Sequence, residues 1–176
     1  MLKQDVETRW NSTFQMLDRL IKMKEAVVSA TFSLRSDLLI NCEEFVAIKQ
    51  ILPILKPFND ITTEISAEKA VTLSKVIVYC KIMINHISKH YAPSVISTYL
   101  EPVQHPIKKL HVEIYKRFGD IESSVLHFEA TVLNPRFKKI GFNSIHKYEN
   151  AVSEIRRRTT AIARVTVATD DNVSQY

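Results

Sequence analysis

The chain has 176 residues, 45% of them hydrophobic, so it can bury a real core and wholesale disorder is excluded. Only two glycines occur, against a usual share of roughly 7%, which argues against a β-rich fold with many tight turns. No apolar run reaches the ~20 residues of a membrane span, and the two cysteines form no CxxC pair. We therefore expect an all-α intracellular protein with a net charge of +5 and no membrane partner.

Apolar residues recur at helical spacing in segments that we expect to form helices at about 12–30, 42–66, 72–90, 107–122 and 144–163. Asn11 or Ser12 can cap the first of them. Pro53 and Pro57 fall inside the second, which predicts a kinked helix or two helices in series. The proline-containing stretch between the third and the fourth predicts a loop.

The order of these segments predicts one helical domain at residues 12–164. Residues 1–11 precede it as an extended segment, and residues 165–176 form a disordered tail. The stretch FEATVLNPRFKKIGF, residues 128–142, has few helix signals and ends on a compact, aromatic-rich loop.

Motifs for catalysis and for cofactors are absent from the sequence. It contains no glycine-rich phosphate loop and no nucleophile motif, so we expect no cofactor, no small-molecule substrate and no enzymatic activity. His86 and His90 have the spacing of two metal ligands on a helix, but no third ligand accompanies them. A surface pair of histidines is the favoured interpretation.

The positive charge is concentrated late in the chain. Residues 135–164 hold eight Lys and Arg against two Asp and Glu, whereas residues 1–134 are almost balanced. This excess includes the run Arg156, Arg157 and Arg158. Such a segment can attract nucleic acid, or it can be the solvated face of a helix.

Two short stretches combine cations with an aromatic ring. Arg9 offers a phosphate-binding fork beside the single tryptophan, Trp10, whose ring can stack on a base; alternatively, Trp10 packs against Phe14 on the first helix. In NPRFKK, residues 134–139, the aromatic ring is surrounded by cations, as suits nucleic acid. The alternative is a loop that ends a helix, with its phenylalanine anchored in the core. The cations of this stretch are Arg136, Lys138 and Lys139.

The same stretches carry a family resemblance. DVETRWNSTFQMLDRL, residues 5–20, resembles the D-x-x-T-R-W-N-S-T-x-x-M-L signature of hAT-superfamily transposases and of the BED-type zinc-finger proteins descended from them. ATVLNPRFKKIGF, residues 130–142, resembles their A-T-x-L-D-P-R-F-K element, although Asn134 replaces the usual Asp. LPILKPFNDITTEIS, residues 52–66, is similar to the segment between the two.

The resemblance implies that the chain is the multi-helix insertion domain of a ribonuclease H-like transposase, with the catalytic core absent. In that family the tryptophan of the first signature handles a flipped base at a DNA hairpin, which assigns this role to Trp10 with Arg9 beside it. The catalytic acids, the BED finger and the dimerisation segment of the family are not among these residues. A nuclear location follows from the same resemblance.

Two functions remain open at this point. The first is a catalytically inactive, DNA-binding or regulatory domain that uses Arg9, Trp10, Arg136, Lys138, Lys139 and residues 156–158. The second is a scaffold that binds a protein partner or a second copy of itself and retains no DNA binding.

Overall fold

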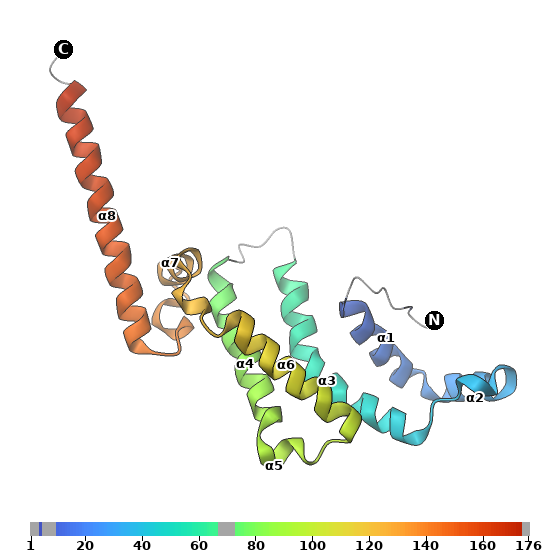
Figure 1. Cartoon of the computed structure of the whole chain (residues 1–176). Helices are drawn as coiled ribbons and strands as arrows, with labels where there is room; N and C mark the ends of the chain where they lie inside the picture. The colour runs from blue at the N-terminus through green and yellow to red at the C-terminus, as the bar shows by residue number, and fades with distance from the viewer. Residues whose placement is uncertain (1–3, 5–9, 67–72, 174–176) are drawn as a thin grey trace. The chain divides into compact units, whose positions relative to one another are not determined.

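The computed structural model describes residue 4, residues 10–66 and residues 73–173, and every regular element in these ranges is a helix (Figure 1). The α-helices are α1 Trp10–Lys22, α2 Lys24–Leu34, α3 Cys42–Ile65, α4 Val76–Tyr91, α5 Pro93–Ile96, α6 Glu101–Phe118, α7 Val125–Leu133 and α8 Ile145–Val173. Short 3₁₀ helices lie between them: η1 Ser36–Leu38, η2 Leu73–Lys75, η3 Ile121–Ser123 and η4 Lys138–Gly141. The all-α prediction is confirmed. None of the described helices has the length and apolar character needed to cross a membrane.

By its internal packing the chain divides into two compact units. The first unit comprises Met1–Ala70 and Met83–Lys116, and the second comprises Val71–Ile82 and Arg117–Tyr176. The chain therefore passes between the units more than once, and helix α4 supplies residues to both.

The first unit is built around an apolar core on α3, α4 and α6. Its buried residues are Ile54, Phe58, Ile87, Val103, Ile107 and Ile114. A capping box starts α3: the Asn41 side chain accepts a hydrogen bond from the Glu44 N–H, and Glu44 accepts one from the Asn41 N–H. The helix then continues through Pro53 and Pro57 as one element rather than two.

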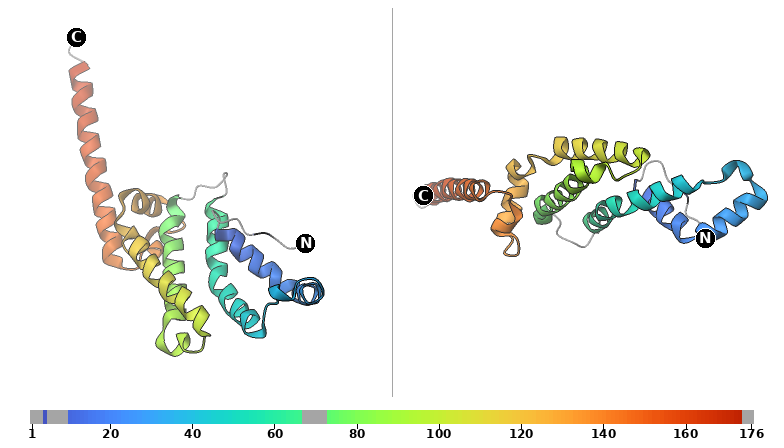
Figure 2. Two further views of the ribbon diagram at one scale, coloured as in Figure 1. Left: turned by 45° about the vertical axis from the view of Figure 1, so that its right-hand side comes forward. Right: turned by 90° about the horizontal axis from the view of Figure 1, so that it is seen from below.

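The second unit has a smaller core, made where α4, α7 and α8 meet (Figure 2). Ile77, Phe128, Phe142 and Ala151 are buried there, and Tyr148 packs its ring edge against Phe142 at a centroid distance of 5.7 Å. The core holds the segment from α7 to the start of α8, which contains the second signature.

Several helix boundaries differ from the expected ones at the N-terminal end of the chain. The predicted helix at 12–30 is two helices, α1 and α2, which separate at Met23 although neither glycine nor proline is present. Because α1 already begins at Trp10, Asn11 and Ser12 lie inside the helix and do not cap it. The extended segment 1–11 otherwise lies outside the described residues.

The later boundaries differ for identifiable reasons. Helix α6 begins at Glu101, not near residue 107, because Pro102 occupies the first turn, where no backbone N–H is needed. Helix α7 was missed because it is short and apolar on most of its surface, so it lacks an amphipathic period. Helix α8 continues to Val173, where we expected a tail from residue 165.

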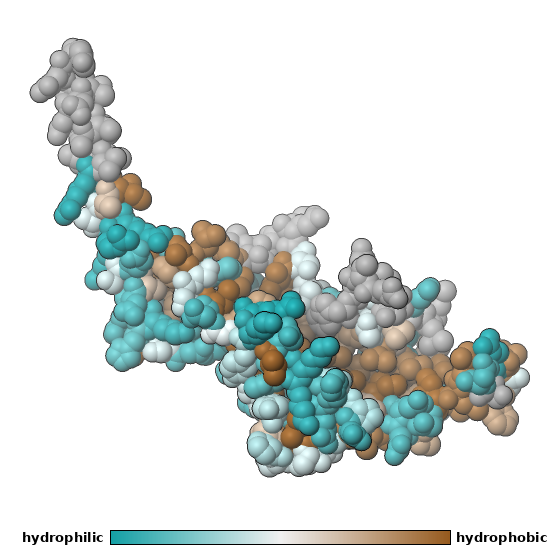
Figure 3. All heavy atoms as spheres, viewed as in Figure 1, coloured by the Kyte–Doolittle hydropathy of each residue, from teal (hydrophilic) through white to brown (hydrophobic). Residues whose placement is uncertain are grey.

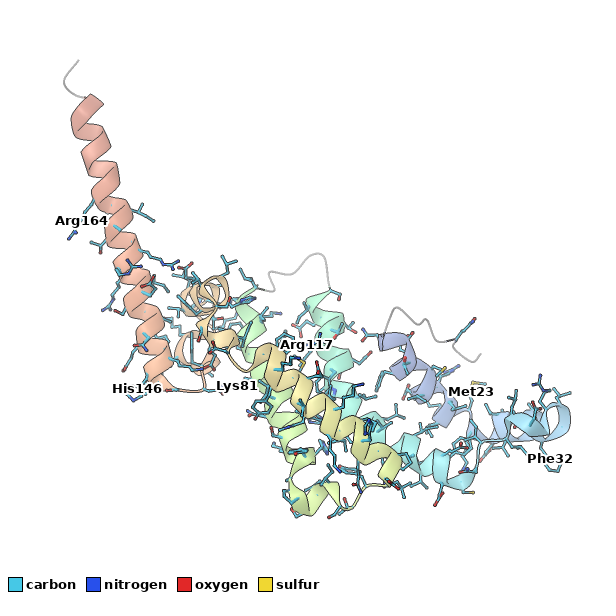
Figure 4. All side chains as sticks on the ribbon, viewed as in Figure 1. Met23, Phe32, Lys81, Arg117, His146 and Arg164 are labelled. Atoms are coloured by element: carbon cyan, nitrogen blue, oxygen red, sulfur yellow. The ribbon has the colours of Figure 1, made fainter. Side chains whose placement is uncertain are left out.

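Hydrophobic side chains remain exposed on the first unit. Figure 3 shows them gathered over α1, α2 and the first half of α3. Helix α2 buries no residue, and its Phe32 and Leu34 are 76% and 80% exposed. Figure 4 shows the Phe32 side chain pointing outward from α2.

Candidate nucleic-acid interface

The residues that we predicted to contact DNA are divided between the two units. Trp10 is the first residue of α1 in the first unit, although its side chain lies outside what the structure describes, as does Arg9. The six others belong to the second unit: Arg136, Lys138, Lys139, Arg156, Arg157 and Arg158. The packing of Trp10 on Phe14 therefore stays a prediction.

The loop that follows α7 starts at Asn134, whose side-chain amide both donates and accepts a hydrogen bond. Asn134 Nδ2 donates to the hydroxyl of Ser74 at 2.8 Å, and its Oδ1 accepts from the backbone N–H of Arg136 at 3.0 Å. The Asn134 carbonyl also accepts bonds from the N–H groups of Phe137 and Lys138. Residues 134–138 thus form a tight turn that is tied to η2.

The other end of the loop is anchored on α4 and α7. Lys81, labelled in Figure 4, donates from Nζ to the carbonyl oxygen of Phe142 at 2.8 Å. Gly141 is buried against the fully buried Thr131, and a Cβ at position 141 would lie 2.6 Å from Thr131 Cγ2. Only glycine fits there without movement of Thr131. The core aromatic of this loop is Phe142; Phe137, the expected anchor, is only half-buried.

Between these anchors the loop presents its cations to solvent. Arg136, Lys138 and Lys139 are all exposed. Lys138 has φ of 40°, in the left-handed region that costs an ordinary residue roughly 1 kcal/mol or more. The backbone keeps a lysine at a position where glycine would fit with less strain.

The arginine run on α8 is partly neutralised by Glu154. Arg157 forms a two-pronged bond with the Glu154 carboxylate at 2.8 and 2.7 Å, and Arg158 Nε reaches the same carboxylate at 2.7 Å. These two guanidinium groups, Arg157 first, lower the pKa of Glu154 to about 2. Arg158 also bonds Glu129 on α7 at 3.1 Å. Among the described acidic residues none pairs with the exposed Arg156.

A buried carboxylate that we did not predict supports the end of the same loop. Glu122 is 4% exposed and accepts the backbone N–H of Asn143 at 2.7 Å. Its other oxygen lies 3.2 Å from Lys147 Nζ, in an ion pair that lacks the geometry of a hydrogen bond. The only sequence signal was an acidic residue at the start of an apolar stretch, which normally indicates solvent exposure.

The two histidines on α4 are engaged in hydrogen bonds within the first unit. His86 Nε2 donates to the carbonyl of Ile54 on α3 at 3.1 Å, and His90 Nδ1 lies 2.6 Å from the Tyr99 hydroxyl. Burial lowers the pKa of His90, as do the nearby His86 and Lys89. No group of three or more His, Cys, Asp or Glu side chains in the described ranges could hold a metal ion.

Comparison with known proteins gives one partial family match and relatives of part of the chain. Residues 1–53 match the family model of the ZBED1 RNase-like helical domain. The chain is 28% identical over 137 residues to human zinc finger BED domain-containing protein 4, covering 78% of this chain and 11% of that protein. These matches support a relationship to hAT/BED-type, transposase-derived helical domains.

A second relative of this transposase-derived domain is the putative transcriptional regulator tpeD of Talaromyces stipitatus, 37% identical over 87 residues, which is 49% of the chain and 10% of the relative. The chain thus spans about a tenth of the length of the curated relatives it matches. No solved structure matches it.

The structure gives a physical role to the one departure from the second signature. The family element has Asp where this domain has Asn134, whose amide donates to Ser74. An Asp carboxylate could only accept at this position, so the hydroxyl of Ser74 would have to reverse its bond. The substitution keeps the turn while removing a negative charge beside Arg136.

Proposed function

We propose that this domain binds DNA in the nucleus as part of a regulatory protein, and that it acts by binding and not by strand transfer. The observation that carries the proposal is the anchored loop, residues 134–143, which holds Arg136, Lys138 and Lys139 in solvent. The relatives support it because one is named a zinc-finger protein and the other a putative transcriptional regulator.

Within this proposal the cations contribute unequally. The three loop cations and Arg156 have full charge available for phosphate oxygens, and an arginine can bind a phosphate through two parallel hydrogen bonds. Arg157 and Arg158 share the carboxylate of Glu154, so their attraction to phosphate is reduced. We therefore assign the main phosphate contacts to the loop and to Arg156.

The test is fluorescence anisotropy of a labelled DNA duplex across a salt series. Removal of the three loop charges in an Arg136→Gln/Lys138→Gln/Lys139→Gln variant should reduce the slope of log K against log salt by about 0.9 for each phosphate that the loop neutralises. The matched control is Lys49→Gln/Lys89→Gln/Lys109→Gln, which removes the same charge from exposed lysines of the first unit that pair with no described acidic side chain. Equal slopes in the two variants would contradict an interface on the loop.

We also propose that Arg9 and Trp10 retain contact with an unpaired base, as the first signature implies. The single tryptophan makes this measurable without a label. Fluorescence of Trp10 should be quenched more by hairpin DNA than by a duplex of the same length. An emission maximum that is already blue-shifted and unaffected by either DNA would instead place the ring in the protein interior.

A second candidate function is self-association through α2, because this helix exposes Phe32 and Leu34 and buries nothing. Its charges lie only at its two ends: Lys24 and Glu25 at the start, Arg35 and Asp37 just after the end. Arg35 and Asp37 already bond each other at 2.7 Å. Two copies in antiparallel contact would bring Lys24 and Glu25 of one copy beside this pair of the other, with only uncharged side chains between the two ends. A second copy of the chain is therefore the occupant that we propose.

Sedimentation velocity over a range of concentrations tests this candidate. The unmodified chain should shift towards a dimer as concentration rises, and Phe32→Ser/Leu34→Ser should remain monomeric. The control is Leu126→Ser/Leu133→Ser, since these leucines of the second unit are 66% and 70% exposed. If the unmodified chain stays monomeric throughout, a second copy does not cover α2.

A further inference from the structure

Three aromatic rings form a continuous row on the outside of the first unit. The ring of Tyr91, the last residue of α4, stacks on that of His111 on α6 with a centroid distance of 4.1 Å and an angle of 15°. The ring of Tyr115, one turn further along α6, follows at 4.7 Å from His111. Tyr91 and Tyr115 are 40% and 46% exposed. We call these three side chains the tyrosine–histidine row.

The row is not needed to fill the contact between the two helices. Ile87, Ile107 and Ile114, at most 5% exposed, already close the interior side of α4 and α6. On the outside the Tyr115 hydroxyl lies 3.1 Å from that of Ser88, which fixes the ring relative to α4. The row therefore keeps part of its aromatic surface in water in a defined position.

The charge around the row is positive. Helix α4 has no acidic residue, and after Glu101 helix α6 has only Glu113. Four lysines on these helices are exposed: Lys89, Lys108, Lys109 and Lys116. In the described part of the chain no acidic side chain pairs with any of them. Figure 3 accordingly shows a mostly hydrophilic surface along α6.

The spacing places cations and rings together. Lys108, His111 and Tyr115 follow one another at intervals of three and four residues, so they share one side of α6. Lys116 lies about 100° further round the helix from Tyr115, at the edge of this side. Lysines interleaved with exposed, stacked rings are the combination that binds single strands, because bases stack on the rings while cations contact the phosphates. The near balance of charges over residues 1–134 does not reveal this local excess of lysines on α4 and α6.

We propose that the tyrosine–histidine row is a stacking site for unpaired nucleobases of a single-stranded nucleic acid, with Lys108 and Lys116 as contacts for its phosphates. The inference rests on the proposed function only in that nucleic acid is the partner of both. It concerns a different unit and a different form of the ligand. Duplex binding by the loop and single-strand binding by the row can therefore be tested, and can fail, independently of each other.

The test uses the full chain and a labelled oligothymidylate of about 20 nucleotides, compared with an abasic strand of the same length and charge. Loss of stacking in Tyr91→Leu and in Tyr115→Leu should weaken oligothymidylate binding by about five- to 100-fold and leave abasic binding unchanged. Tyr115→Phe, which keeps the ring, should bind as the unmodified chain does. Val112→Ala, which shortens a side chain that is 58% exposed on the same helix and outside the row, is the matched control.

A second measurement uses only the unmodified chain, so it does not depend on whether a variant folds. In the unmodified chain, the ring protons of Tyr91 and Tyr115 should shift in NMR spectra on addition of oligothymidylate but not of the abasic strand. Equal binding of the two strands, or unshifted rings at saturation, overturns the proposal. If folded leucine variants bind normally while the loop variant of the second unit loses both duplex and single strand, the row is not the site, and the proposed function survives.

Discussion

The two units stabilise their helices in different ways. The first packs six apolar side chains from three helices into one cluster, and its polar contacts are mostly at the margin. The second has four buried apolar residues and adds buried polar groups: Glu122, Thr131 and Ser74. The polar groups hold one loop in place, which is what a surface of exposed cations requires. The comparison shows that a charged loop can be ordered by contacts hidden beneath it.

The largest effect should come from the apolar cluster. Ile54→Ala removes a side chain with 0% exposure and leaves a cavity, so the free energy of unfolding should fall by about 2–5 kcal/mol in urea titrations. Val46→Ala on the same helix, where the side chain is 45% exposed, is the control and should cost well under half as much. Similar losses for both would mean that α3 is not the centre of this core.

A smaller effect should follow from loss of the buried carboxylate. Glu122→Ala leaves the Asn143 N–H and Lys147 without their partner, so the free energy of unfolding should fall by about 1–3 kcal/mol. Asp120→Ala is the control, because that side chain is 82% exposed and its oxygen lies 3.9 Å from Lys147. If Glu122→Ala left the free energy of unfolding unchanged, polar contacts would not be what holds the second unit together.

The strained lysine predicts a change in the opposite direction. Lys138→Gly should raise the free energy of unfolding by up to about 1 kcal/mol by relieving the positive φ, while weakening duplex binding. Lys139→Gly removes the same charge from the next position of η4 and should lower stability instead. Comparing the two variants separates the effect of backbone strain from that of the lost charge. If both changed the free energy of unfolding in the same direction, Lys138 would not be strained.

The smallest effect is expected from Glu154 and depends on pH. Its folded pKa, about 2, is lower than its usual value of 4.5, so its stabilising contribution is complete above about pH 4.5 and is lost as pH falls through 2. The melting temperature of Glu154→Gln should therefore lie slightly below that of the unmodified chain at pH 7. Thermal scans at successively lower pH should bring the two together, and a constant gap would contradict this assignment.

Apolar periodicity predicted much of the first unit. The stripe of α3 was identified with nearly the correct ends, because its apolar residues repeat at helical spacing. The division of α1 from α2 at Met23 was not predictable, since no breaker residue is present and only tertiary contacts select the break.

The second unit was harder to predict, because its anchors join residues distant in sequence. Asn134 meets Ser74 and Lys81 meets Phe142 across about sixty residues, and no local pattern indicates either contact. The cations of the loop were found by composition alone. Their order in space, and the neutralisation of Arg157 by Glu154, required the structure. The tyrosine–histidine row was missed because its rings come from two helices.

The alternation of the chain between the units has a consequence for the integrity of the protein. Residues 71–82 belong to the second unit but are flanked on both sides by the first, so no single cut yields either unit whole. A premature stop after Lys116 would remove Phe128 and Phe142, against which Ile77 packs. The shortened product would display apolar surface and become a substrate for cellular quality control, so incomplete copies would be removed rather than accumulate as a competing half-protein.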